Sequence, residues 1–260
     1  MSVPVYRLDI AYDGSGFKGY ARQDGVRTVQ GELEGALETY LGGPVTTAVA
    51  GRTDAGVHAR RQVVSFEFGG EPDLERLAKA INGIIGPEVS VLEVSRAGDG
   101  FNARHSAVWR RYRYRMDMRP SPDPLCRHLI WHVGRALDMG SMVSTGEVLV
   151  GEHDFTSFCR TVEGRSNVRR LTELTVDESE GRVDLWVQAN AFCHQMVRSI
   201  VGYLYDVGRG FSDPARVAEV IVSRDRSMVA TVAPAHGLTL WEVGYDVSVR
   251  SKAGIPDLGH

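Results

Sequence analysis

The chain has few cysteines and no arrangement of residues that suggests a metal site. Its 260 residues include three cysteines, at positions 126, 159 and 193, and none of them has Cys-x-x-Cys spacing. An odd number without that spacing indicates neither a disulfide framework nor a zinc knuckle, so we expect buried or inert thiols. The eight histidines form no ligand pair at helical spacing with an acidic partner, and no metal is expected.

Long hydrophobic runs are also missing. No apolar run reaches the length of about 18 residues that a membrane-spanning helix needs. Residues 1–7 contain no apolar signal stretch and lead directly into an alternating strand pattern. The sequence therefore predicts a cytoplasmic protein.

Lysine is scarce, with residues only at positions 18, 79 and 252, so arginine supplies nearly all of the positive charge. The net charge of -3 argues against a protein that coats nucleic acid nonspecifically, because counterion release needs many cationic contacts. A local basic cleft remains compatible with this charge, since arginine is well suited to phosphate forks and to stacking on bases.

What is present is a series of strand and helix patterns that do not strictly alternate. A chain of this length can bury roughly three quarters of its unfolded surface, as one large domain or two closely packed ones. The first half predicts strands near 5–13, 45–50, 63–68 and 88–97 and helices over 29–41 and 73–85, the first capped by Thr28. The second half predicts a long strand over 106–118, a proline-rich connection over 119–124, a helix over 139–150, strands near 168–177 and 182–190, two further helices, and a last strand near 238–247. This order favours an α+β protein.

One loop between two predicted strands carries a carboxylate beside a cation. Residues 51–58 read Gly-Arg-Thr-Asp-Ala-Gly-Val-His. Arg52 would keep the Asp54 carboxylate ionised and ready to act as a nucleophile or base. The alternative is structural, because an aspartate in a glycine-flanked turn often accepts hydrogen bonds from its own backbone.

This loop resembles the active-site loop of the tRNA pseudouridine synthase A family. Further segments match that family in order, namely residues 12–20, 28–34, 101–107, 110–114, 151–158, 189–198 and 233–238. The chain departs from the family pattern after Gly19, where Tyr20 stands in place of the usual Trp and Ala21 in place of the following Gln.

The resemblance implies an α+β pseudouridine synthase fold. In that fold two pseudo-symmetric ferredoxin-like halves share a central, mostly antiparallel sheet with helices outside. The expected divisions are an N-terminal half over 1–105, a C-terminal half over 106–248 and a tail over 249–260. The implied function is isomerisation of uridine to pseudouridine at positions 38, 39 and 40 of the tRNA anticodon stem-loop, by a homodimer that needs no cofactor.

The resemblance also implies the site residues. Asp54 would be the catalytic nucleophile, Arg198 would pair with it, and Tyr112 would stack on the base and take part in proton transfer. Substrate contacts are expected from Arg52, Tyr112, Arg110, Arg111 and Arg22. For His58 and His153 we expect hydrogen-bonded structural roles.

The residues themselves leave structural alternatives open. Strand alternation places Arg110, Tyr112 and Tyr114 on one face of the strand over 106–118, where the tyrosines could simply fill the core. Arg198 lies off the apolar stripe of a predicted helix over 192–207, where it could simply be solvated.

Two other functions are also open. A noncatalytic RNA-binding module would use the tyrosines and arginines but would not require Asp54. A glycoside hydrolase would need a second carboxylate that the loop does not offer.

Overall fold

The computed structural model describes residues 3–160 and 162–245. The chain divides into two compact units. Unit 1 comprises Met1–Ala107 and Leu238–Val243, and unit 2 comprises Val108–Gly237 and Gly244–His260. Each unit combines strands with helices, so the predicted α+β class is confirmed. None of the helices in the described ranges is long and apolar enough to cross a membrane.

Unit 1 is built on a mostly antiparallel sheet. Its central strand, β3 (His58–Glu67), pairs with β1 (Val5–Tyr12), and β1 pairs in turn with β4 (Val89–Arg96). On its other side β3 pairs with β2 (Thr47–Val49), which is antiparallel, and with β10 (Leu238–Gly244), which is parallel. β2 lies beside residues 64–66 of β3 and β10 beside residues 58–59. The loop that carries Asp54 therefore runs from the end of β2 to the start of β3, where β10 pairs with β3.

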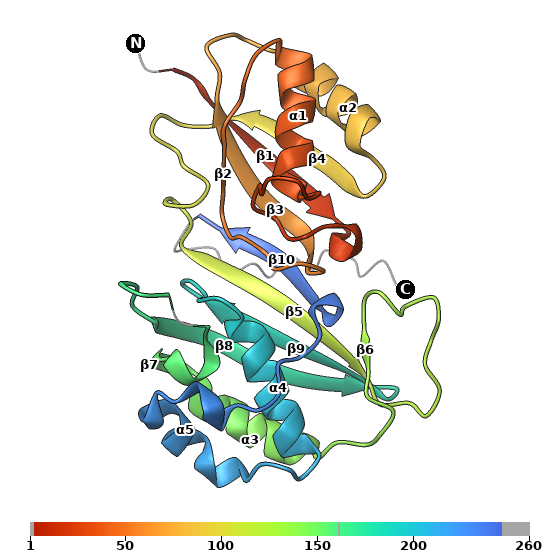
Figure 1. Ribbon diagram of the computed structural model, residues 1–260, viewed down its shortest axis with the longest axis vertical. Coiled ribbons are helices and arrows are strands. Elements are labelled where there is room, and N and C mark those ends of the chain that lie inside the picture. The colour runs from red at the N-terminus through yellow and green to blue at the C-terminus, as the bar shows by residue number, and fades with distance from the viewer. Residues whose placement is uncertain (1–2, 161, 246–260) are drawn as a thin grey trace. The chain divides into compact units, whose positions relative to one another are not determined.

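Two helices cover this sheet. Figure 1 shows α1 (Val29–Leu41) and α2 (Leu74–Ile85) side by side on one face, and α2 packs against β4. The Thr28 hydroxyl accepts a 3.2 Å hydrogen bond from the Gly31 amide, which confirms the predicted N-cap. Asp73 caps α2 in the same way through the Arg76 amide. These caps fix the starts of both helices.

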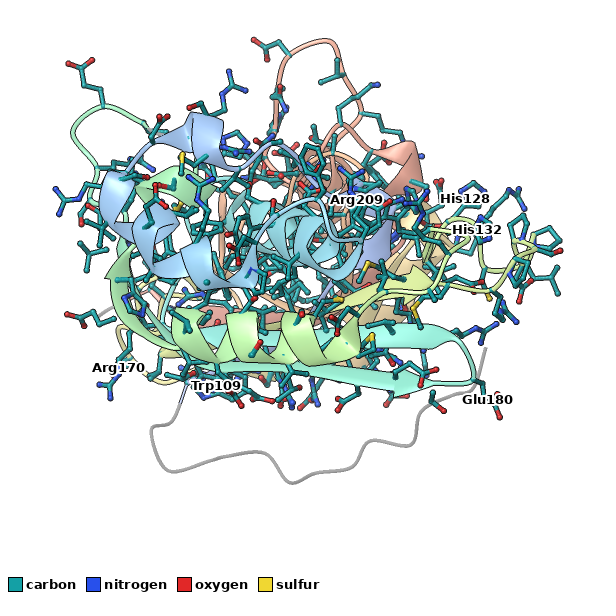
Figure 2. The ribbon with its side chains drawn as sticks, turned by 90° about the horizontal axis from the view of Figure 1, so that it is seen from below. Trp109, His128, His132, Arg170, Glu180 and Arg209 are labelled. Carbon is teal, nitrogen blue, oxygen red and sulfur yellow. A yellow bond between two sulfur atoms is a disulfide. The ribbon has the colours of Figure 1, made fainter. Side chains whose placement is uncertain are left out.

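The strands of unit 2 are antiparallel in the order β5 (Trp109–Asp117), β9 (Arg182–Ala189), β8 (Val168–Ser179) and β7 (Gly151–Asp154), with the short β6 (Trp131–His132) parallel to β5. β8 and β9 form a hairpin whose two turn residues, Glu180 and Gly181, have φ of +53° and +77°. Positive φ at both positions is typical of a tight hairpin turn. Figure 2 shows Glu180 at the tip of the hairpin and Arg170 at its other end.

The helices of unit 2 are α3 (Met139–Leu149), α4 (Met196–Gly208) and α5 (Val217–Ser223). α3 packs against β8, α4 and α5, and Figure 2 shows it lying along the β8–β9 hairpin. α4 is buried along almost its whole length, and among its residues only Arg198 and Tyr205 are partly exposed. This agrees with the prediction that Arg198 lies off the apolar stripe of this helix.

Several boundaries differ from those predicted. α4 begins at Met196 rather than at residue 192, because the chain before it makes a turn in which the Met196 amide donates to the Cys193 carbonyl and Gln195 has φ of +65°. β3 begins at His58, earlier than the predicted 63, and the short β6 and β7 were not predicted. The end of the last predicted strand and the tail over 249–260 lie outside the described residues.

The expectation for the cysteines is wrong for two of them. Cys159 and Cys193 form a disulfide across a separation of 34 residues, whereas Cys126 is buried and free. Their Cα atoms lie 5.9 Å apart, and no spacing rule reveals such a long-range approach. Within the described ranges, no group of three or more His, Cys, Asp or Glu residues is arranged to hold a metal ion.

Candidate functional site

Asp54 lies on a tight turn between β2 and β3. Its backbone carbonyl accepts a 3.1 Å hydrogen bond from the Val57 amide, and its side chain is partly buried. Gly56 follows with φ of +79°, a conformation that costs glycine little. The chain can therefore turn within a few residues and enter β3 at His58.

A buried polar cluster fixes the backbone just before Asp54. The hydroxyls of Thr53 and Tyr12 lie 2.8 Å apart, and the Gln62 side-chain amide donates to the Gly51 carbonyl at 2.7 Å. Burial raises the pKa of Tyr12 to about 12, so this phenol stays protonated at neutral pH. Because Gly51 and Thr53 are both held, the Asp54 backbone starts from a defined position.

The segment after β1 supports the same loop from another direction. The Tyr20 amide donates to the Thr53 carbonyl at 3.0 Å. Gly19 has φ of +99°, and a Cβ there would lie 3.2 Å from that carbonyl oxygen. At Gly14 a Cβ would run into the Val57 carbonyl. These two glycines let the backbone pass close to both ends of the Asp54 turn.

The two histidines have structural roles of different kinds. His58 is 3% exposed and its Nδ1 accepts a 3.1 Å hydrogen bond from the Gly14 amide, so the predicted role is confirmed. His153 packs edge-on against Phe155, with 5.8 Å between ring centroids. Its Nε2 is buried and has no hydrogen-bond partner among the residues that the structure describes, so the hydrogen bond expected there is wrong. His153 contributes through packing.

Two arginines of unit 1 belong to segments that border the Asp54 loop. Arg52 is exposed and forms no ion pair in the described part of the chain, including with Asp54. Arg22 is also exposed, although its Nη1 lies 3.3 Å from Oε2 of the buried Glu34. Its amide donates to the Gln30 side chain at 3.0 Å, which ties its backbone to the start of α1. Contact of either residue with substrate stays a prediction.

In unit 2, Tyr112 lies near the start of β5 and pairs with Val187 of β9. Its ring is 7% exposed and meets the Phe192 ring edge-on, with 5.0 Å between centroids and 87° between planes. Edge-to-face contact of this kind is a favoured arrangement for aromatic pairs and restricts ring rotation. Phe192 therefore sets the orientation of Tyr112.

Arg198 lies in the first turn of α4. Its Nε donates a 2.8 Å hydrogen bond to the Ala233 carbonyl, and the Ala233 amide donates back to the Arg198 carbonyl at 3.0 Å. Because Nε is bonded, the plane of the guanidinium is fixed. A fixed arginine fork suits a bidentate contact with a carboxylate.

The predicted residues thus fall into two sets. Asp54, Arg52 and Arg22 belong to unit 1, and Tyr112, Arg198, Arg110 and Arg111 belong to unit 2. Within each unit the structure holds the central residue of the set, Asp54 or Arg198, by backbone hydrogen bonds.

Comparison with known proteins identifies the family. Residues 147–246 match the family model described as tRNA pseudouridine synthase. The chain is 46% identical to tRNA pseudouridine synthase A of Streptomyces avermitilis, over 97% of this chain and 95% of that protein. The protein of the same name from Methylobacterium nodulans is 42% identical over 97% of this chain and all of its own length. The chain belongs to the tRNA pseudouridine synthase A family.

Other comparisons agree or add little. The tRNA pseudouridine synthase A of Frankia casuarinae is 46% identical, over 96% of this chain and 93% of its own. Among solved structures, a chain from a Cbf5-Nop10-Gar1 complex matches with a TM-score of 0.38 and 16% identity, over 79% of this chain and 45% of that one. At that TM-score the likeness carries no argument.

The departure from the family pattern at Tyr20 concerns packing. Its side chain is 0% exposed, and its ring lies 6.2 Å from that of Tyr12. Burial raises the pKa of the Tyr20 hydroxyl well above its ordinary value. The side chain that replaces the usual tryptophan of the tRNA pseudouridine synthase A family therefore fills the core beneath the Asp54 loop. Ala21, beside it, is partly exposed.

Arg110 and Arg111 are both engaged within unit 2. Arg110 is 8% exposed and donates to the Asn190 carbonyl at 2.8 Å. Arg111 is on the opposite face of β5, where it forms a 2.6 Å ion pair with Glu173 and covers the Trp186 ring at 4.6 Å. Contact of either residue with substrate stays a prediction.

The sequence reasoning missed the residues that support this site. In unit 1 these are Tyr12, Thr53 and Gln62, and in unit 2 they are Phe192 and Ala233. Gln62 carried a usable signal, because a glutamine before the apolar run over 63–66 is unusual in a buried strand. Ala233 carried none, since it acts through its backbone.

Proposed function

We propose that this chain converts uridine to pseudouridine in the anticodon stem-loop of tRNA, at positions 38, 39 and 40, with Asp54 as the catalytic residue. Membership of the tRNA pseudouridine synthase A family gives the reaction, an isomerisation of uridine in tRNA. The observation that supports Asp54 is the construction of its loop, in which buried hydrogen bonds at Gly51 and Thr53 hold the backbone before a carboxylate that is only partly buried.

The reaction breaks the N-glycosidic bond, rotates the uracil and rejoins it to the ribose through C5. One carboxylate can assist in two ways. It can attack covalently, or it can stabilise the sugar cation and remove the C5 proton. Both need a carboxylate held in one place, which the Asp54 turn supplies.

The other site residues have complementary roles in this proposal. Arg198 pairs with the Asp54 carboxylate through its Nη groups and orients it. The Nε bond to the Ala233 carbonyl fixes the plane of the guanidinium for this pairing. Tyr112 offers an aromatic ring whose orientation Phe192 fixes, and a base stacked on such a ring gains roughly 1 to 3 kcal/mol. Arg52 is the exposed cation beside the flipped nucleotide, whose extraction costs a few kcal/mol.

Three further properties follow from the resemblance to the family. The two units are proposed to be pseudo-symmetric halves of the pseudouridine synthase fold, since each has antiparallel strands and covering helices. The working form is proposed to be a homodimer that grips one tRNA. Its expected place of action is the cytoplasm.

The decisive experiment is a chemical map of pseudouridine in an unmodified tRNA transcript after incubation with the purified protein. Wild-type protein should produce pseudouridine in the anticodon arm. Asp54→Ala and Asp54→Asn should produce none, while their affinity for tRNA stays within about tenfold of wild type, because phosphate contacts supply most of the affinity.

A matched control is Asp99→Asn, which neutralises another carboxylate of unit 1 that is exposed. This variant should keep wild-type activity. If Asp54→Ala lost binding and activity equally, Asp54 would be a structural residue. If wild type bound tRNA tightly but made no pseudouridine, the chain would be the noncatalytic RNA-binding module considered above.

A further inference from the structure

Residues 231–237 of unit 2 form a connecting segment that contacts both α4 and β5. The segment leads from the last helical turns into β10 and contains only a short 3-10 turn, Ala235–Gly237. Ala233 is 0% exposed. Buried polar backbone groups of an irregular segment must find their hydrogen bonds outside it, and at Ala233 and Pro234 both neighbours supply them.

On one side the segment is joined to α4. The Arg198 side chain donates to the Ala233 carbonyl and the Arg198 carbonyl accepts from the Ala233 amide, at 2.8 and 3.0 Å. One turn further along the helix, Gly202 faces the Thr231 carbonyl so closely that a Cβ would collide with it. The segment thus lies directly on the helix backbone.

On the other side the segment is joined to β5. The Tyr114 hydroxyl donates a 3.0 Å hydrogen bond to the Pro234 carbonyl, one residue after the carbonyl that holds Arg198. A Cβ at Gly237 would lie 2.6 Å from Cζ of the same tyrosine. Tyr114 is 0% exposed, and its ring meets that of Trp131 edge-on at 6.3 Å.

Burial raises the pKa of Tyr114 far above its ordinary value, and the charge of Arg198 opposes this rise. The phenol therefore stays protonated and able to donate a hydrogen bond at neutral pH. Prolines have no amide hydrogen, so the Pro234 carbonyl is the only backbone polar group of that residue. The hydrogen bond from the Tyr114 hydroxyl therefore joins Pro234 to β5.

We propose that Tyr114 is a positioning residue for Arg198, acting through the 231–237 segment. Its hydroxyl fixes the Pro234 carbonyl, this fixes the adjoining Ala233 carbonyl, and that carbonyl sets the plane of the Arg198 guanidinium. The inference rests on the proposed function, in which Arg198 orients the catalytic carboxylate. Tyr114 itself touches neither substrate nor Asp54 in this role.

The first test is Tyr114→Phe, which removes one oxygen and keeps the ring. Its single-turnover rate at saturating protein should fall about tenfold, since one tenfold step corresponds to the loss of a hydrogen bond of ordinary strength. The tRNA dissociation constant should stay within about twofold. The matched control is Tyr6→Phe, whose hydroxyl likewise donates to a backbone carbonyl, that of Gly70 at 2.8 Å, but in unit 1. It should leave the rate unchanged.

A double-mutant cycle separates positioning from general structural support. Arg198→Lys keeps the positive charge but has no Nε to bond to Ala233, and it should slow the reaction more than Tyr114→Phe does. Adding Tyr114→Phe to Arg198→Lys should change the rate by less than about twofold, because the contact through which Tyr114 acts is already gone.

A second measurement does not depend on activity. The Arg198 Nε–H signal in a ¹⁵N NMR spectrum, assigned by its disappearance in Arg198→Lys, should exchange with water at least about tenfold faster in Tyr114→Phe. It should be unaffected in Tyr6→Phe. Gly202→Ala, which pushes the segment away from α4, should have the same effect on exchange and on rate.

The outcomes distinguish the two levels of the proposal. If Arg198→Lys and Arg198→Ala are as active as wild type, the proposed role of Arg198 fails. If those variants are slow but Tyr114→Phe has a normal rate, the function stands and the positioning role of Tyr114 is overturned. The same holds if the rate reductions caused by Tyr114→Phe and Arg198→Lys multiply in the double mutant. Unchanged Nε–H exchange in Tyr114→Phe also overturns it.

Discussion

At the scale of single residues, Tyr112 offers the most direct test of how the base is handled. Tyr112→Phe keeps the ring and its contact with Phe192 but removes the hydroxyl. If that hydroxyl transfers a proton, the single-turnover rate should fall roughly 10- to 100-fold. Binding of tRNA should be retained, because the face available for stacking is unchanged.

Tyr203→Phe is the control for this variant. Tyr203 is another buried tyrosine of unit 2, packed edge-on against Phe158, and we assign it no role in the reaction. Its substitution should leave turnover as in wild type. A Tyr112→Phe enzyme with normal turnover would show that the hydroxyl is idle and that Tyr112 contributes only its ring.

Gln62 tests how strongly the Asp54 loop depends on its buried support. The residue is 0% exposed, and Gln62→Leu would leave the Gly51 carbonyl without the 2.7 Å bond it now accepts. Such a loss should lower the free energy of unfolding by about 1 to 3 kcal/mol, measured by urea denaturation. Gln23→Leu breaks an exposed bond of the same type, to the Lys18 carbonyl, and should cost less than about 0.5 kcal/mol. Equal losses would mean that burial of the Gln62 bond is unimportant.

The site residues could be predicted from sequence only where a side chain carries the signal. Asp54 stood out because its loop contains two glycines and a neighbouring arginine. Ala233 could not stand out, because it acts through its backbone carbonyl and its partner, Arg198, is distant in sequence. The Cys159–Cys193 disulfide was missed for the same reason, since its 34-residue separation is invisible to local spacing.

At the scale of elements, regular periodicity was a reliable guide and irregular backbone was not. The helix predicted over 29–41 has those bounds, because both its cap and its apolar stripe are local properties. The helix predicted from residue 192 begins at Met196, because the turn at Gln195 interrupts a sequence that is still apolar in pattern. The two-residue β6 depends entirely on its pairing with β5, which no local pattern encodes.

Three helix-interior glycines give an element-scale prediction. Gly35 in α1 and Gly83 in α2 have no atoms within 4 Å of an added Cβ and no positive φ, so alanine at either should raise the free energy of unfolding by about 0.5 to 1 kcal/mol. Gly146 in α3 is different, because its Cβ would lie 2.6 Å from a methyl group of Leu174 on β8. Gly146→Ala should destabilise by about 1 to 3 kcal/mol. Urea unfolding of the three variants checks this, and a stabilising Gly146→Ala would contradict the packing of α3 on β8.

At the scale of the whole molecule, the charge pattern limits how the protein can hold RNA. The chain carries 30 basic and 33 acidic side chains, for a net charge of -3. Many arginines are used internally, as in the pairs Arg111–Glu173 and Arg27–Glu88. We therefore propose that exposed arginines such as Arg52 and Arg22 supply the phosphate contacts locally.

Such local contacts predict a clear dependence on salt. Each phosphate contact releases a counterion, so the logarithm of the tRNA association constant should fall linearly with the logarithm of salt concentration, and affinity should drop at least tenfold between about 50 and about 200 mM. The single-turnover rate at saturating protein should stay within about twofold, because in the proposed mechanism the chemical step takes place at the Asp54 carboxylate and not at the phosphate contacts. Asp54→Asn should show the same slope as wild type, whereas a double substitution of Arg22 and Arg52 by Gln should make the slope shallower. An affinity independent of salt would mean that stacking, and not the arginines, holds the RNA.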